Sequence, residues 1–234
     1  MLRARASAKA ESAREVASDA IAAVKPKLRG VSHQWAFVVS LFLGAGLIVT
    51  AKTPKATLAV AIYAVSLSAL FGCSALYHRV NWTRPNVRLL MRRLDHSMIF
   101  FLIAGTYTPF ALLVLDGPLA NAILLVVWIG AIAGAVVEMI WIDHPKWVAA
   151  LIYMSLGSVA AVAFPELWSD MGITGTLLVA AGGLLYTAGA VVYATQRPNP
   201  SPAVFGYHEI FHALVVAAAA AHFTAIAFFA LPAA

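Results

Sequence analysis

The residues with the clearest capacity for chemistry are two histidines at the start of the last long apolar run. Residues 207–212 read Tyr-His-Glu-Ile-Phe-His, so His208 and His212 stand at positions i and i+4. Side chains with this spacing share one face of a helix, and their imidazoles can converge on a single ion. Ionisable groups inside apolar segments are costly and usually functional. The pair therefore indicates a metal site within an apolar helix.

A third histidine and two further polar residues could complete such a site. Ser74 and His78 are separated by one helical turn near the end of another apolar run, and Asp95 stands just before a third. Three neutral imidazoles, with a fourth position left to water, form the arrangement of catalytic zinc sites, in which the pKa of the water falls to about 7. We therefore predict a Zn2+ ion held by His78, His208 and His212, with Ser74 and Asp95 beside the water.

Asp95 has two competing interpretations. Its carboxylate could orient or deprotonate the water, as a general base does. It could instead cap the following helix or pair with the neighbouring Arg92 or Arg93, which would make its role structural. Spacing leaves both open, and we take Asp95 and Ser74 as the candidate catalytic residues.

The elements that position these residues are membrane-spanning helices. With 62% hydrophobic and 11% charged residues over 234 positions, the chain is too apolar for an ordinary soluble domain. Its apolar runs have the length of about 20 residues that crosses a bilayer core, and they are continuous, unlike the short alternating segments of a β-barrel. The sequence predicts an all-α integral membrane protein, a bundle of seven transmembrane helices. The expected spans are about 34–50, 57–77, 97–115, 119–141, 147–164, 174–194 and 209–231.

Basic residues indicate how this bundle is oriented. Fourteen of the sixteen Lys and Arg residues lie on one side of the predicted bundle, and Lys52 and Lys55 lie on the other. By the positive-inside rule, the N-terminus is cytoplasmic and the C-terminus extracytoplasmic, in the cell membrane. The same topology accounts for the net charge of +6, so the lipid bilayer is the expected partner and nucleic acid is not. The single cysteine, Cys73, excludes an intramolecular disulfide.

This topology places the polar residues of the spans at one depth. The residues expected at the inner, cytoplasmic ends of the spans are Ser74, His78, Asp95, His96, Glu138, His208, Glu209 and His212. Snorkelling to the interface is mainly a behaviour of Lys and Arg, so it does not explain a group of His, Asp and Glu. Their position on one side indicates a single site.

Four other histidines are expected outside the ligand set. His33 and His144 fall at interfacial loop edges, where no special role is needed. His96 directly follows Asp95 and points about 100° away on a helix, so we expect it beside the site or at the interface. His222 lies ten residues past the last predicted ligand, about 15 Å further along the helix, and we expect a buried, hydrogen-bonded side chain.

The chain divides into two parts. Residues 1–28 are expected to form a cytoplasmic tail, and residues 29–234 the seven-transmembrane domain. Within the tail, small apolar residues recur at helical spacing before Pro26. A short helix lying on the inner leaflet is one interpretation, and a solvated, partly disordered tail is the other.

Three segments together resemble the hemolysin III family. They are SALYH (74–78), RRLDHSMIFFLIAGTYTP (92–109) and YHEIFH (207–212), and the resemblance covers roughly residues 29–232. That family belongs to the wider adiponectin and progestin receptor group, in a superfamily that includes alkaline ceramidases. The resemblance implies a seven-helix bundle with a zinc ion near the inner leaflet. The positions to which it carries over are His78, His208 and His212 for zinc, with Ser74 and Asp95 around the bound water.

Two functions use these residues directly. A zinc-dependent hydrolase of lipid amide or ester bonds, similar to a ceramidase, would use Asp95 as general base and Ser74 to steady the oxyanion. Its lipid substrate would enter between the helices. A receptor-like or regulatory membrane protein would instead use the same three histidines to hold a structural zinc ion. We take the hydrolase as the primary hypothesis and the receptor-like protein as the alternative.

Two further functions have weaker support. The run His208-Glu209-x-x-His212 matches the zincin motif, which would make the protein an intramembrane metalloprotease with Glu209 as base. That class needs a third ligand, commonly downstream, and only His222 follows. Pore-forming haemolysis is suggested by the family name, but a polytopic chain with few charges to line a lumen is a poor candidate.

Overall fold

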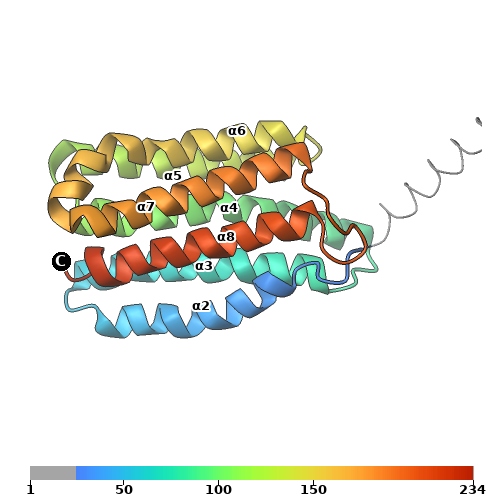
Figure 1. Ribbon diagram of the computed structural model, residues 1–234, viewed down its shortest axis with the longest axis horizontal. Helices are drawn as coiled ribbons and strands as arrows, with labels where there is room; N and C mark the ends of the chain where they lie inside the picture. Colours follow the sequence, from blue (N-terminus) through green and yellow to red (C-terminus); the bar gives the residue numbers. More distant parts are fainter. Residues whose placement is uncertain (1–24, 234) are drawn as a thin grey trace, which may run out of the picture.

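The computed structural model describes residues 25–233, which fold into helices without a β-strand (Figure 1). The expectation for a helix within the tail falls mostly on residues 1–24, outside this range. The elements are α2 (Val31–Thr50), α3 (Pro54–Arg79), α4 (Pro85–Leu113), α5 (Gly117–Ile140), α6 (Lys146–Gly157), η1 (Ser158–Ala163), α7 (Phe164–Thr195), α8 (Tyr207–Ala225) and η2 (Ile226–Ala230). The predicted all-α class is confirmed.

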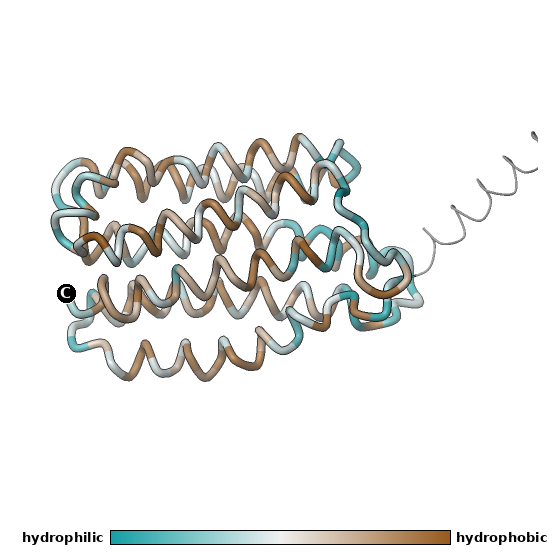
Figure 2. Tube along the Cα trace, in the orientation of Figure 1, coloured by the Kyte–Doolittle hydropathy of each residue, from teal (hydrophilic) through white to brown (hydrophobic). Residues whose placement is uncertain are grey.

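Within residues 25–233, six helical segments are long and apolar enough to cross a membrane. They are Val31–Thr50, Pro54–Arg79, Pro85–Leu113, Gly117–Ile140, Lys146–Thr195 and Tyr207–Ala230. Large apolar side chains also cover the outside of the bundle, among them Phe42, Val49 and Leu184. Figure 2 shows the apolar colour along most of the helix lengths. A continuous apolar exterior suits a lipid bilayer and would be a liability in water.

The sequence explains where several of these helices begin and break. Thr53 accepts a hydrogen bond from the backbone N–H of Ala56 at 3.1 Å, and Pro54 follows it at the first helical position of α3. Pro85 likewise occupies the first helical position of α4, where Arg84 provides no side-chain cap. Within α7, Gly172 has φ +67° and ψ 179°, which interrupts the helix at a conformation open mainly to glycine. Figure 1 shows α6 and the later part of α7 side by side, because the chain reverses within the first part of α7.

The start of α4 corrects one prediction. The third span was expected to begin at about residue 97, but the helix that carries it already begins at Pro85. Arg, Leu and Met dominate the residues between these two positions and are strong helix formers. The apolar run marks only the later part of the helix, because the first turns carry three arginines, Arg88, Arg92 and Arg93.

One end of the bundle collects the basic residues, and we call it the basic end. It carries the loops at residues 80–84, 141–145 and 196–206 and the chain leading into α2, and the C-terminal end of the described chain lies opposite (Figure 1). The basic residues at this end are Lys25, Lys27, Arg29, Arg79, Arg84, Arg88, Arg92, Arg93, Lys146 and Arg197. Helix α3 packs between α2 and α4, and α8 packs on α7 and α2. The last turn of α3 and the first turns of α2 and α8 therefore meet at the basic end.

Candidate metal centre

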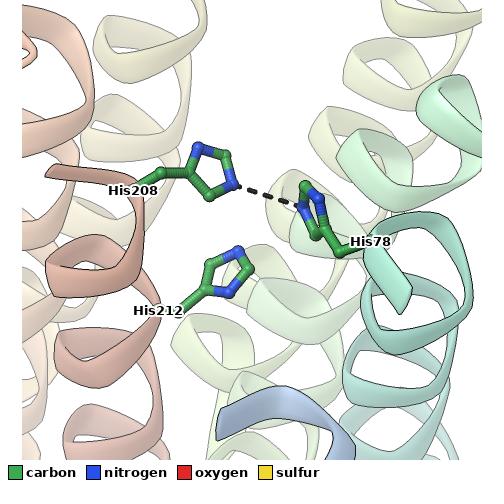
Figure 3. Close-up of side chains that lie close together, drawn as sticks. All are labelled: His78, His208 and His212. Atoms are coloured by element: carbon green, nitrogen blue, oxygen red, sulfur yellow. Dashed lines mark hydrogen bonds between the residues drawn. The ribbon is translucent and has the colours of Figure 1, made fainter. Parts of the chain in front are cut away.

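Three histidines meet at the basic end, inside the bundle. His78 comes from the last turn of α3, and His208 and His212 come from the first turns of α8. One ring nitrogen from each lies within 4.8 Å of those of the other two, and the Nε2 atoms of His78 and His208 are 3.3 Å apart (Figure 3). All three side chains are buried. The structure thus brings together the three residues that the sequence predicted as metal ligands.

The start of α8 is fixed by hydrogen bonds that do not involve the histidines. The Glu209 carboxylate accepts a hydrogen bond from the backbone N–H of Gly206 at 2.7 Å, and Asn199 Oδ1 accepts one from that of Tyr207 at 3.2 Å. These contacts satisfy N–H groups that a helix start leaves without partners. Glu209 also forms an ion pair with Arg29. Its carboxylate is therefore engaged away from the histidines, which argues against a metalloprotease base.

Asp95 lies beside the three histidines. Its Oδ2 atom is 3.4 Å from Nε2 of His78 and 3.8 Å from Nδ1 of His96. Asp95 stands well inside α4, so it does not cap that helix. Arg92 instead pairs with Asp143, at 2.8 Å between Nη1 and Oδ1. The geometry supports an interaction with the histidines over the two structural interpretations of Asp95.

Ser74 faces the same region from one turn before His78. It is 2% exposed, and its Oγ atom has no hydrogen-bond partner among the described residues. A buried hydroxyl without a protein partner is unusual and indicates a bound water, an ion or a functional role. Sequence spacing predicted this placement, because residues at i and i+4 share one helix face.

A small cavity joins these groups. Its volume is about 30 Å³, enough for water. Leu70 and several other apolar side chains form part of its lining, and the polar part includes His33, Ser74, Asp95, His96, His208 and His212. Imidazole nitrogens and one carboxylate around a water-sized space form a donor set that suits zinc or a related divalent ion. The residues present therefore fit a metal with an open coordination position.

His33 differs from the prediction of a loop-edge histidine, whereas His144 lies in the loop between α5 and α6 as predicted but has a hydrogen-bond partner. His33 lies in the first turn of α2 and is buried, and its ring stacks on His212 with centroids 3.8 Å apart. His144 is buried too, with its Nε2 atom 3.0 Å from the Glu138 carboxylate, which also accepts a hydrogen bond from Tyr153. The first helix starts three residues before the predicted 34–50 span, which places His33 inside the bundle rather than before it.

The other two histidines agree with expectation. His96 lies next to the site, where Nδ1 contacts the Arg92 carbonyl oxygen at 2.8 Å and Nε2 contacts the Tyr193 hydroxyl at 3.2 Å. His222 is buried, and its Nε2 atom donates to the Val179 carbonyl oxygen at 3.1 Å. Neither belongs to the group of three histidines whose nitrogens converge.

Comparison with known proteins gives relatives over most of the chain. Hemolysin-3 of Bacillus cereus is 35% identical over 180 residues, which cover 77% of this chain and 78% of the relative. The Hemolysin-3 homolog of Bacillus subtilis (strain 168) is 30% identical over 168 residues, with 72% and 75% covered. The human Monocyte to macrophage differentiation factor is 30% identical over 168 residues, with 70% and 67% covered.

A family match spans the helices that carry the site. Residues 21–223 match the family described as Haemolysin-III related, and this range includes His78, Asp95, His208 and His212. The resemblance drawn from the three sequence segments is thereby confirmed. The chain belongs to the haemolysin-III-related family.

Proposed function

We propose that this protein is an integral membrane zinc hydrolase that cleaves amide or ester bonds of lipids. The observation that carries the proposal is the convergence of three histidine nitrogens within 4.8 Å, beside a small cavity that Asp95 and Ser74 also line. A structural metal site needs only the ligands. An open cavity with a carboxylate and a free hydroxyl is what hydrolysis requires in addition.

The bundle would cross the membrane seven times. Lys146–Thr195 contains the non-helical Gly172, where the chain reverses, so this segment would supply two crossings. The described basic residues divide ten to two between the basic end and the opposite end, which carries Lys52 and Lys55. By the positive-inside rule the basic end and the N-terminus face the cytoplasm, and the C-terminus lies outside. The site would then open near the inner leaflet of the cell membrane.

The chain's own residues have distinct tasks in this mechanism. His78, His208 and His212 hold the metal through their ring nitrogens. When bound, zinc supplies Lewis-acid chemistry, which polarises a carbonyl oxygen and activates water. Asp95 accepts and holds a proton as general base. Ser74 donates a hydrogen bond from its free hydroxyl to the oxygen on which negative charge develops.

The apolar walls of the site support a lipid as the substrate. The apolar part of the cavity lining includes Leu70, Ile99, Phe211 and Val215, from three helices. These side chains would contact an acyl chain and keep bulk water from the reacting bond. A polar substrate would gain nothing from them and would lose its hydration on entry.

The receptor-like alternative also rests on particular observations. The cavity of about 30 Å³ has room for water but not for a lipid carbonyl with its chain, so the helices must separate before a substrate binds. One relative bears the name Monocyte to macrophage differentiation factor, which describes a regulatory role of that protein. In this alternative, the zinc ion would hold α3 and α8 together, and the protein would cleave no substrate.

Replacing Asp95 tests catalysis separately from metal binding. We expect the zinc-loaded wild type to release fatty acid from a ceramide or a phosphatidylcholine in detergent micelles, measured by mass spectrometry. Asp95→Asn should slow release by about 10²- to 10⁴-fold, as loss of a general base does, with zinc content and melting temperature retained. Asp143→Asn makes the same chemical change at an exposed carboxylate and should have no effect on release.

Two results would contradict the hydrolase proposal. One is a wild-type protein that holds one zinc per chain but releases no fatty acid from either lipid, which would favour the structural zinc ion. The other is equal release by Asp95→Asn and the wild type, which would remove Asp95 from the mechanism.

A further inference from the structure

His33 is in direct contact with a predicted metal ligand, although it is not itself one of the three. Its ring lies almost parallel to that of His212, with an interplanar angle of 11° and centroids 3.8 Å apart. Phe71 also contacts the His33 ring, edge-on, with centroids 5.1 Å apart. His33 is 3% exposed, and neither of its ring nitrogens has a hydrogen-bond partner among the described residues.

The chain before α2 fixes the position of His33. The backbone N–H groups of Lys27 and Leu28 donate to the carbonyl oxygens of Ala203 and Val204, at 3.1 and 3.2 Å. Arg29 forms its ion pair with Glu209, in the first turn of α8. Residues 27–29 are thus attached to the loop at residues 196–206 and to α8, the helix that carries two of the three histidines.

Gly30 brings the same segment against the third histidine. It has φ +76°, and a Cβ atom at this position would lie 2.6 Å from Cβ of His78. The backbone therefore passes His78 at a distance that only glycine allows, in a conformation that favours glycine. The segment contacts α3 at His78 and α8 at Glu209, and His33 follows one turn later.

His212 lacks the support that a metal-binding histidine usually has. Such a residue normally donates its second ring N–H to a carboxylate or carbonyl oxygen, which fixes the orientation of the ring. The Nδ1 atom of His212 has no hydrogen-bond partner among the described residues. Its ring is held by packing instead, and the most closely stacked neighbour is His33.

We infer that His33 is a positioning residue of the metal centre. Its stacked ring restricts the His212 imidazole to the orientation in which a nitrogen reaches those of His78 and His208. The planar ring performs this task rather than its nitrogens, because the nitrogens of His33 lie outside the group that converges on one point. The role presupposes the proposed zinc site, and it makes the metal affinity of α8 depend on α2.

Two substitutions separate the ring from its nitrogens. His33→Phe keeps a planar ring against His212 and removes both nitrogens, whereas His33→Ala removes the ring. Zinc affinity would be measured on the full chain in detergent by competition with a chromophoric chelator. The visible spectrum of the Co2+-substituted protein would report ligand geometry. His222→Ala is the matched control, because it removes a buried histidine ring from the same bundle away from the site.

We expect His33→Ala to weaken zinc binding by about 10-fold or more and to alter the cobalt spectrum, as loss of an outer support of a ligand does. His33→Phe should restore both to nearly wild-type values. If the alanine variant does not fold, His33→Leu fills the space without a planar face and should show the same weakening.

The inference is overturned if His33→Ala and His33→Leu bind zinc as tightly as the wild type. It is also overturned if His33→Phe is as weak as His33→Ala, because the nitrogens and not the ring would then matter. A wild-type protein that binds no zinc would overturn the proposed zinc site as well, and the wild-type arm distinguishes that failure from failure of the His33 role alone.

Discussion

Helix α8 carries buried histidines in two places, and their surroundings differ. At its start, nitrogens of His208 and His212 lie within 4.8 Å of one on His78, and no backbone carbonyl of the described part of the chain engages them. Deeper in the bundle, the ring of His222 donates to the Val179 carbonyl oxygen and fits closely against Gly182, where a Cβ atom would lie 2.4 Å from Nε2. Residue type and burial are shared, so neither identifies a site. The hydrogen-bond or nitrogen neighbour of each ring nitrogen is what distinguishes the two places.

The comparison predicts that the two places respond differently to substitution. A buried imidazole that donates to a carbonyl oxygen already has its hydrogen bond, and an outside ligand would have to displace it. Nitrogens that face one another at short range gain most from a cation placed between them. The histidines at the start of α8 should therefore make the stability of the protein depend on bound metal, and His222 should not contribute to that dependence.

The largest effect should come from removing a single ligand from α3. His78→Ala should lose zinc and, with it, the stabilisation that a bound ligand confers, about 4 kcal/mol when free zinc exceeds its Kd a thousandfold. Thermal unfolding with and without a metal chelator measures this loss. The chelator should lower the melting temperature of the wild type and of His222→Ala, but not that of His78→Ala.

The comparison would fail if the chelator left the wild-type melting temperature unchanged. It would fail equally if His222→Ala lost its response to the chelator together with His78→Ala. Either result would mean that the two places on α8 do not differ in the way their nitrogen partners indicate.

A smaller effect should come from the carboxylate that fixes the start of α8. Glu209→Gln leaves Arg29 without its ion-pair partner. We expect the free energy of unfolding to fall by about 2 kcal/mol. Breaking a fully buried pair costs ~3–5 kcal/mol, and the cost is lower here because Arg29 is partly exposed. Zinc content and hydrolysis should persist, since the partners of the carboxylate are Gly206 and Arg29 rather than the histidines. Asp170→Asn, at an exposed position, is the control for loss of a negative charge.

Loss of hydrolysis in Glu209→Gln, with zinc and fold intact, would reverse the assignment of roles. It would restore the zincin interpretation, in which Glu209 is the base. Thermal denaturation, zinc analysis and the fatty-acid release assay on the same preparation separate these outcomes.

The parts that could be predicted from sequence are those with a local or periodic signal. The spacing of His208 and His212 places both on one helix face, and the distribution of basic residues places His78 and Asp95 at the same end of the bundle. The structure brings these residues together. That they bind zinc stays a prediction.

The parts that were missed depend on packing between distant segments. His33 stacks on a residue 179 positions later, and Gly30 lies against His78, contacts for which a single sequence has no periodic signal. The ion pair of Arg29 with Glu209 spans 180 positions in the same way. The one local hint was the glycine shortly before a histidine at the start of an apolar run, since glycine permits the close approach and positive φ seen here.

The central claim is that the three histidines hold one metal ion, and metal content tests it most directly. Wild-type protein purified in detergent without chelators would be analysed by elemental mass spectrometry beside His208→Ala/His212→Ala, prepared in the same way. The account predicts about one zinc per wild-type chain and background levels in the double variant. Equal metal in both proteins, or none in the wild type, would contradict it.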